Sequence, residues 1–84
     1  MDYMKEAKKA VAAYANARLA ESKDEEITLN DVIIVWFAKT LQNFKALLIT
    51  PEHYGMYFEV NFNGDKNELY LDAYRKADNM AIKF

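Results

Sequence analysis

Few side chains of this sequence are of the types that carry out covalent catalysis. His53 is the only histidine, Ser22 is the only serine, and there is no cysteine. A serine triad would have to bring both residues together with a carboxylate and an oxyanion hole. Ser22 lies beside a charged link at the end of a predicted helix, and His53 follows Pro51 in a predicted exposed loop. We therefore predict no catalytic residue and no enzymatic activity.

Ligands for a metal ion are equally sparse. Thiolate sites are excluded by the absence of cysteine, and a bound ion needs several donors that converge with defined geometry. Asp24, Glu25 and Glu26 are consecutive, so their side chains point in different directions, as is typical of a solubilising run. The sequence predicts no metal site and no cofactor.

The residues best suited to binding lie in predicted strands. Glu59 lies in the middle of a predicted strand. It is either an ordinary exposed residue or a polar contact in a ligand site or subunit interface. Lys39 and Lys45 flank a predicted hairpin and are expected to lie close together on adjacent strands. Lysines beside an aromatic side chain can hold the phosphate of a nucleotide whose base stacks on the ring. The candidate interface or ligand-binding residues are Trp36, Lys39, Lys45, Tyr57, Glu59 and Asn61.

The segment from residue 32 to residue 50 must position several of these side chains. It predicts two strands, 32–41 and 44–50, joined by a two-residue turn at Gln42 and Asn43, since asparagine tolerates positive φ. Successive residues of a strand point to opposite faces of the sheet, so this segment places apolar side chains on both faces. The sequence leaves open whether Trp36 or Phe37 lies on the second face.

Helical spacing of apolar residues predicts a helix over 2–21, with a solvated opposite side. That side carries Lys5, Lys8, Lys9 and Asn16, and a solvated link follows at Ser22–Glu26. A third strand, 56–63, alternates in the way expected of a half-buried antiparallel strand. Its apolar side chains are Met56, Phe58, Val60 and Phe62.

The C-terminal segment allows two interpretations. A helix over 66–81 would be preceded by Asp65 and Glu68 at capping-box spacing, and it would align Tyr70, Tyr74 and Met80 on one side. Alternatively, residues 63–65 form a turn into a fourth strand, 68–75. We favour the helix. The predicted fold is then α+β, with an antiparallel three-stranded meander and both helices on the Phe58 face. The alternative is an N-terminal helix with a four-stranded antiparallel sheet.

Bulk properties indicate one domain over residues 1–84. The hydrophobic fraction of 52% argues against disorder, and the net charge of −2 lacks the basic character of a dedicated nucleic-acid binder. No apolar run approaches the length of a membrane span, and no apolar signal segment begins the chain. We expect a cytoplasmic protein with no membrane partner.

Several segments together resemble a family of small uncharacterised proteins, a domain of unknown function found in phages and prophages of Gram-positive bacteria. The matching residues are Met1–Lys9, Val35–Leu47, Gly55–Tyr57, Asn63–Lys66 and Tyr70–Tyr74. Ala77 departs from this resemblance, which implies a larger aromatic residue there. The resemblance supplies no catalytic residue. It implies a phage origin, an accessory role and a location in the host cytosol.

These observations predict a non-enzymatic binding protein. Two helices on one face leave the second sheet face to bind another copy of the chain, as a dimer or larger oligomer, and to bind an unknown host protein, with counter-defence as one such role. The alternative is a protein that sequesters a nucleotide signal, or binds nucleic acid, through the aromatic side chains and lysines of the sheet.

Overall fold

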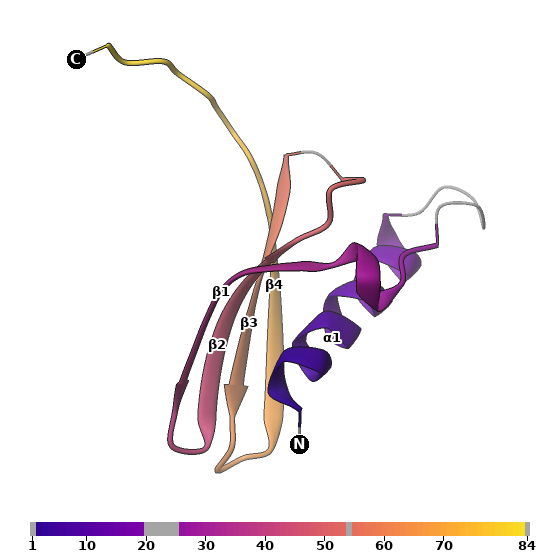
Figure 1. The fold of residues 1–84 in the computed structure, drawn as a ribbon, viewed down its shortest axis with the longest axis vertical. Coiled ribbons are helices and arrows are strands. Elements are labelled where there is room, and N and C mark those ends of the chain that lie inside the picture. The colour runs from indigo at the N-terminus through magenta and orange to yellow at the C-terminus, as the bar shows by residue number, and fades with distance from the viewer. Residues whose placement is uncertain (1, 20–25, 54, 84) are drawn as a thin grey trace.

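A computed structural model describes residues 2–19, 26–53 and 55–83 (Figure 1). Across these ranges the chain forms a helix, a single 3-10 turn and four strands that make one antiparallel sheet in the order β1-β2-β3-β4. The helix lies against one face of this sheet, which makes the fold α+β. The elements are α1 (Tyr3–Arg18), η2 (Leu29–Asp31), β1 (Ile33–Thr40), β2 (Asn43–Ile49), β3 (Met56–Asn63) and β4 (Glu68–Arg75).

The fourth strand corrects the prediction of a helix over 66–81, and the alternative fold is the one observed. Asn63 explains why the chain turns here: its side-chain Oδ1 accepts hydrogen bonds from the backbone N–H groups of Asp65 (3.0 Å) and Lys66 (3.3 Å). Asn67 then adopts a positive φ of 53°, which a helix interior would not allow. The Asn63 bonds would suit a helix N-cap as well as a turn, so it is the positive φ of Asn67 that ends any helical path and leads the chain into β4. After β4, residues 76–83 extend from the sheet, and we call them the C-terminal arm.

Helix α1 begins at Tyr3 and is capped by Asp2, whose carboxylate accepts a hydrogen bond from the Lys5 backbone N–H (3.1 Å). It ends at Arg18, earlier than the predicted residue 21, and residues 20–25 of the predicted helix end and link lie outside the described residues. Its buried positions are mostly small, so the helix axis can approach the sheet closely. These positions are Ala7, Val11, Ala12 and Ala15.

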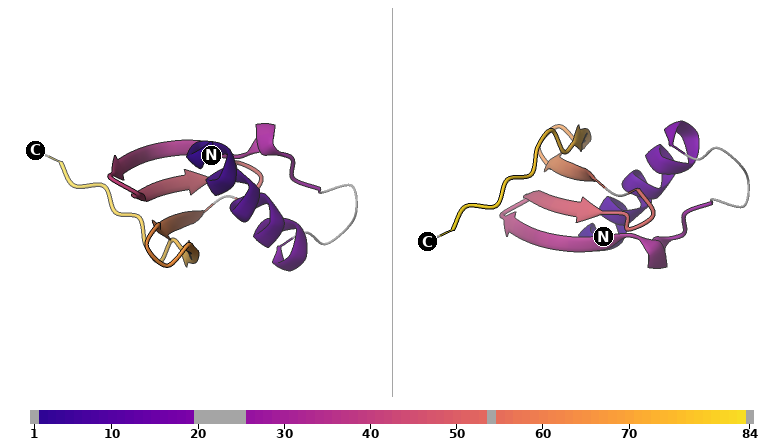
Figure 2. Two further views of the ribbon diagram at one scale, coloured as in Figure 1. Left: turned by 90° about the horizontal axis from the view of Figure 1, so that it is seen from below. Right: turned by 90° about the horizontal axis from the view of Figure 1, so that it is seen from above.

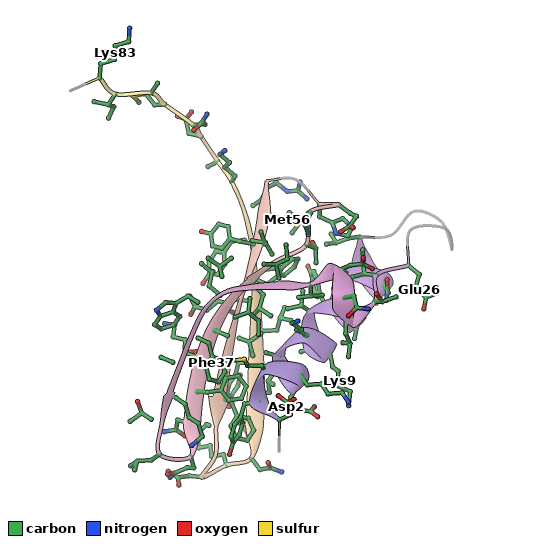
Figure 3. The ribbon with its side chains drawn as sticks, viewed as in Figure 1. Asp2, Lys9, Glu26, Phe37, Met56 and Lys83 are labelled. Carbon is green, nitrogen blue, oxygen red and sulfur yellow. The ribbon has the colours of Figure 1, made fainter. Side chains whose placement is uncertain are left out.

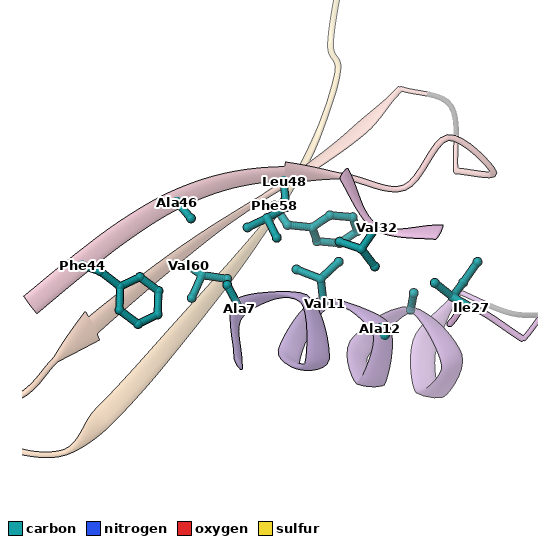
Figure 4. Close-up of a cluster of buried hydrophobic side chains, with 11 residues drawn as sticks. Ala7, Val11, Ala12, Ile27, Val32, Phe44, Ala46, Leu48, Phe58 and Val60 are labelled. Carbon is teal, nitrogen blue, oxygen red and sulfur yellow. The ribbon is translucent and has the colours of Figure 1, made fainter. Parts of the chain in front are cut away.

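The core lies between α1 and the face of the sheet that the alternation of β3 predicted (Figure 4). Phe58 and Leu48, directly opposite each other on β3 and β2, are both 0% exposed. The Tyr14 ring of α1 meets the Phe58 ring edge-on, with centroids 5.8 Å apart. Nearer the hairpin ends, Phe37, Phe44 and Phe62 form a ladder of stacked rings across three strands, with successive centroids 5.4 Å apart.

The β1–β2 turn differs from the prediction. Its two central residues are Leu41 and Gln42, and Leu41 takes the positive φ of 55° that was expected of an asparagine. The neighbouring β3–β4 turn packs closely against it: the Gly64 N–H donates to Asn43 Oδ1 (2.9 Å), and a Cβ on Gly64 would lie 2.3 Å from the Gln42 carbonyl oxygen. Gly64 is therefore required by a close approach between two turns.

A β-bulge between Ile34 and Trp36 decides which aromatic residue faces the helix. Beyond the bulge, Trp36 pairs with Leu47 on the face opposite α1, whereas Phe37 pairs with the buried Ala46 on the helix side (Figure 3). The bulge gives β1 one residue more than β2 at this point. As a result, consecutive apolar residues of β1 can lie on both faces of the sheet.

Candidate binding face

The helix covers one face of the sheet and leaves the other uncovered, as the two views of Figure 2 show. We call this uncovered surface the open face. The strand registers place on it alternate residues from all the strands that the structure describes. They are Ile33, Trp36, Ala38 and Thr40 of β1, Asn43, Lys45, Leu47 and Ile49 of β2, Tyr57, Glu59, Asn61 and Asn63 of β3, and Glu68, Tyr70, Asp72 and Tyr74 of β4.

Large aromatic side chains dominate the open face. Trp36 and Tyr70 are each 50% exposed, and the paired Tyr57 and Tyr74 are each 39% exposed. The Tyr57 and Tyr74 rings are stacked across β3 and β4, with centroids 5.0 Å apart and planes 12° apart. Rigid rings of this kind lose little conformational entropy on binding, and contiguous exposed apolar surface is typical of interaction sites.

A polar network occupies the middle of this face. The Glu59 carboxylate pairs with the Lys45 ammonium (Oε1 to Nζ, 3.2 Å) and accepts a hydrogen bond from the Asn61 amide (3.1 Å). The Asn61 amide and then the Lys45 ammonium lower the pKa of Glu59 below its ordinary value. Because this carboxyl group holds its proton less readily than usual, it is poorly suited to act as a general acid.

We expect this network to be visible in the titration of Glu59. Asn61→Ala should raise the pKa of Glu59 toward the ordinary value of about 4.3, and Lys45→Met should raise it less, since Asn61 is the larger cause. The pKa is lower in the folded state, so the network stabilises the fold above the ordinary carboxyl pKa and loses that effect as pH falls through the lowered one. NMR of the Glu59 side-chain carboxyl measures the shift. Lys66→Met, in the β3–β4 turn, is the control, and an equal effect from it would contradict the assignment.

The open face is net acidic. Among its described side chains, Lys45 supplies one positive charge, while Glu59, Glu68 and Asp72 supply negative ones. The negative charges of Asp72 and, less strongly, Glu59 raise the pKa of the Tyr74 phenol, and a hydrogen bond to Glu68 raises the pKa of Tyr70. A surface of this sign repels a phosphate backbone and attracts cationic groups.

Lys39 does not join the other candidate residues. It pairs with Phe44 on the helix side of the sheet, where its Nζ lies 5.2 Å from the centre of the Tyr3 ring and donates to the Leu41 carbonyl. Lys45 is on the open face, so the two lysines point to opposite sides and the predicted phosphate-holding pair does not form. The other candidates share the open face: Trp36, Lys45, Tyr57, Glu59 and Asn61.

The residues considered for catalysis are not brought together. His53 is half-buried, where the sequence predicted an exposed loop residue, and its Nδ1 lies 2.9 Å from the hydroxyl of the buried Thr50. Ser22 lies outside the described residues. In the part of the chain that the structure describes, no group of three or more histidine, aspartate or glutamate side chains could hold a metal ion.

Sequence reasoning missed part of the open face. The β4 edge of this face carries Tyr70, Asp72 and Tyr74. The favoured prediction had placed these three residues in a helix, outside the sheet. In the structure Leu69 and Leu71 pack against the core while Glu68, Tyr70 and Asp72 are exposed, which is the alternation of a strand with one buried face. Ala77, where the resemblance implied an aromatic residue, is exposed in the C-terminal arm.

The fold and this face together define a small α+β protein with one uncovered sheet surface. The sequence profile of a family of unknown function, DUF6275, matches residues 4–84, and the chain belongs to this family. No curated protein and no solved structure matches the chain. Within residues 2–19, 26–53 and 55–83, no helix is both long and apolar enough to cross a membrane.

Proposed function

We propose that this protein is a non-enzymatic binding module whose open face binds a protein partner rich in arginine or lysine. The observation that carries the proposal is the combination, on one uncovered surface, of Trp36, Tyr57, Tyr70 and Tyr74 with a net acidic charge. Guanidinium and ammonium groups are attracted to the faces of aromatic rings and to carboxylates. Asp72 and Tyr70 offer both kinds of contact on the same strand.

The charge of the open face also favours a different protein over a second copy on this surface. Two open faces packed together would place Asp72 and Glu68 of each copy in one acidic layer, and like charges across an interface oppose association. The position of Lys39 on the opposite face removes the main support for the nucleotide-binding alternative. We therefore do not propose nucleotide sequestration as a second function.

The biological setting is proposed from the resemblance described above. Similarity to small phage and prophage proteins of Gram-positive bacteria supports a phage accessory role in the host cytosol. There, the basic partner would be a host protein, and interference with host defence is one role that such binding could serve.

Affinity capture from a Gram-positive lysate, followed by binary affinity measurements on the captured protein, tests the proposal. We expect Trp36→Ser and Asp72→Lys each to weaken the dissociation constant about tenfold or more, as truncation of central aromatic residues and charge reversal do at interfaces. Raised salt should release the partner. Lys9→Glu, an exposed charge change on α1, is the matched control and should leave the affinity unchanged.

Two results would contradict the proposal. The first is equal affinity of the wild-type chain and both open-face variants for the captured protein. The second is capture of a nucleotide or nucleic acid, detected by mass spectrometry and nuclease treatment, in place of a protein.

A further inference from the structure

A hollow of about 420 Å³ lies on the open face beside the β1–β2 and β3–β4 turns. Its character differs from that of the acidic residues next to it. Among the described residues that line it, Lys45 is the one charged side chain, and uncharged amides and an aromatic ring supply much of the rest. We call it the amide hollow. It is defined by Ala38, Asn43, Lys45, Asn61, Asn63 and Tyr70.

The two turns fix the orientation of two amides in the hollow. The Gly64 N–H donates to Asn43 Oδ1 (2.9 Å), and the N–H groups of Asp65 and Lys66 donate to Asn63 Oδ1 (3.0 and 3.3 Å). A backbone N–H group only donates, so the oxygen of each amide must face the turn. The Nδ2 groups of Asn43 and Asn63 have no hydrogen-bond partner among the described residues. They therefore remain as donors for a ligand.

The other polar groups of the hollow are also held in place. An ionised carboxylate only accepts, so Asn61 turns its Nδ2 to Glu59 (3.1 Å) and keeps its Oδ1 as an acceptor. Lys45 Nζ lies 3.2 Å from the same carboxylate. The Tyr70 hydroxyl donates to Glu68, which positions a ring that is 50% exposed. The hollow thus combines amide donors, an amide acceptor and a flat aromatic wall.

This combination suits an uncharged ligand group. A carboxylate or phosphate would meet the carboxylates of Glu59 and Glu68, whereas the one ammonium, Lys45, already pairs with Glu59. Guanidinium and ammonium groups have donors only, so they would leave Asn43 and Asn63 without an acceptor. An apolar group would displace water from the amides and replace none of its hydrogen bonds.

We propose that the amide hollow binds the side-chain carboxamide of a glutamine or asparagine from the protein partner of the open face. The carbonyl oxygen of that side chain accepts from Asn43 and Asn63. Its NH2 group donates to Asn61 Oδ1, and its flat surface packs on the Tyr70 ring. A hydroxyl group would supply no such flat surface. This inference rests on the function proposed for the open face, because it names a second contact of the same partner.

The spacing of residues on β4 relates this contact to the cationic one. Asp72 follows Tyr70 on the same face of the strand, about 7 Å farther along it. Alternate side chains of an extended partner segment have the same spacing. An arginine at Asp72 and a glutamine in the amide hollow would then be separated by one residue of the partner.

Blocked tripeptides test the proposal by NMR titration of the complete chain. Each probe is an acetylated tripeptide N-methylamide with arginine and a variable residue on either side of an alanine, made in both orders. With glutamine as the variable residue, the side-chain amide resonances of Asn43 and Asn63 should shift. Its affinity should exceed that of the leucine peptide about fivefold, the effect of roughly one net hydrogen bond. Equal affinity for the two peptides would overturn the proposal.

Two other ligands give outcomes that would also overturn it. The first is tighter binding of the glutamate peptide, which would identify the hollow as a carboxylate site. The second is tighter binding of a nucleoside monophosphate at the same amide resonances. Its base offers a flat surface with similar hydrogen-bonding groups, but its phosphate would meet the net acidic charge of the open face.

A variant that fills the hollow provides a second readout. Ala38→Phe adds a ring within the hollow, removes no hydrogen bond, and should abolish the preference for the glutamine peptide over the leucine peptide. Val35→Phe is the matched control, because Val35 is 55% exposed on the same strand and does not line the hollow. It should preserve the preference. Equal behaviour of the two variants would contradict the site.

The amide hollow and the cationic contact can fail separately. Asp72→Lys should weaken binding of every arginine-containing peptide. It should not change the Asn43 and Asn63 shifts caused by a glutamine peptide in which alanine replaces arginine. Arginine peptides that bind equally well to Asp72→Lys would contradict the open-face proposal alone. If neither glutamine peptide shifts these two amides at millimolar concentration, the amide-hollow proposal is overturned, whatever the arginine contact does.

Discussion

Replacing Phe58 with alanine should lower the free energy of unfolding by about 3–5 kcal/mol. Phe58 is 0% exposed, lies opposite Leu48 and packs against the Tyr14 ring of α1. Its removal would leave a cavity where the helix and the sheet meet, and the backbone hydrogen bonds of β3 would hinder collapse around it. A domain of this size has a total stability of only about 4–13 kcal/mol, so a large part would be lost. Urea unfolding followed by circular dichroism measures the change.

Tyr57→Ala is the matched control, because Tyr57 is adjacent in sequence but lies on the open face with 39% of its surface exposed. It loses the stacking on Tyr74, worth about 0.5–1.5 kcal/mol, and little buried area. Equal losses from the two substitutions would contradict the assignment of faces in β3.

Asn16→Ala should cost about 2 kcal/mol, although Asn16 is an exposed residue that the sequence placed on a solvated helix side. Its amide Nδ2 donates to the Ile27 carbonyl oxygen (2.9 Å), and its Oδ1 accepts from the Ile27 N–H (2.6 Å). Ile27 is only 4% exposed, so both backbone groups would lose their partners in a poorly hydrated site. The same urea experiment measures the loss.

Asn79→Ala, in the C-terminal arm, is the control for Asn16→Ala and should change the free energy of unfolding by less than about 0.5 kcal/mol. A similar effect of the two substitutions would show that the Asn16 amide does not hold the Ile27 segment to α1. Amide hydrogen exchange at Ile27, faster in Asn16→Ala than in the wild type, would locate the change.

Sequence patterns correctly predicted the elements in which the spacing of apolar side chains fits only a strand or only a helix. β3 spans the predicted residues, 56–63, because its apolar and polar side chains alternate without exception from Met56 to Asn63. The Ala-rich N-terminal segment forms a helix whose apolar side meets the sheet. The existence of an uncovered face also followed from the sequence, since β1 and β2 carry more apolar side chains than one face accommodates.

The missed features depend on contacts between distant segments. Residues 68–75 carry apolar or aromatic side chains on both faces, so their alternation is hidden and a helical stripe through Tyr70 and Tyr74 fits equally well. The bulge at Ile34 and the turn at Leu41 each shift the register by about one residue. Neither shift is what separates Lys39 from Lys45. A two-residue turn at either position pairs Lys39 with a neighbour of Lys45, namely Ala46 in the predicted register and Phe44 in the observed one, so the two lysines point to opposite faces and the sequence alone could have shown it.

The meander has a consequence for how the chain folds. Within the described residues, each strand is hydrogen-bonded to the strands that precede and follow it in the sequence. Such short-range pairing is typical of domains that reach their native state quickly, because little entropy is spent in closing long loops. During synthesis, however, α1 emerges from the ribosome before the sheet, and the surface it packs against is completed only once the later strands have been made. We therefore expect α1 to dock late, with its apolar stripe available to chaperones until then.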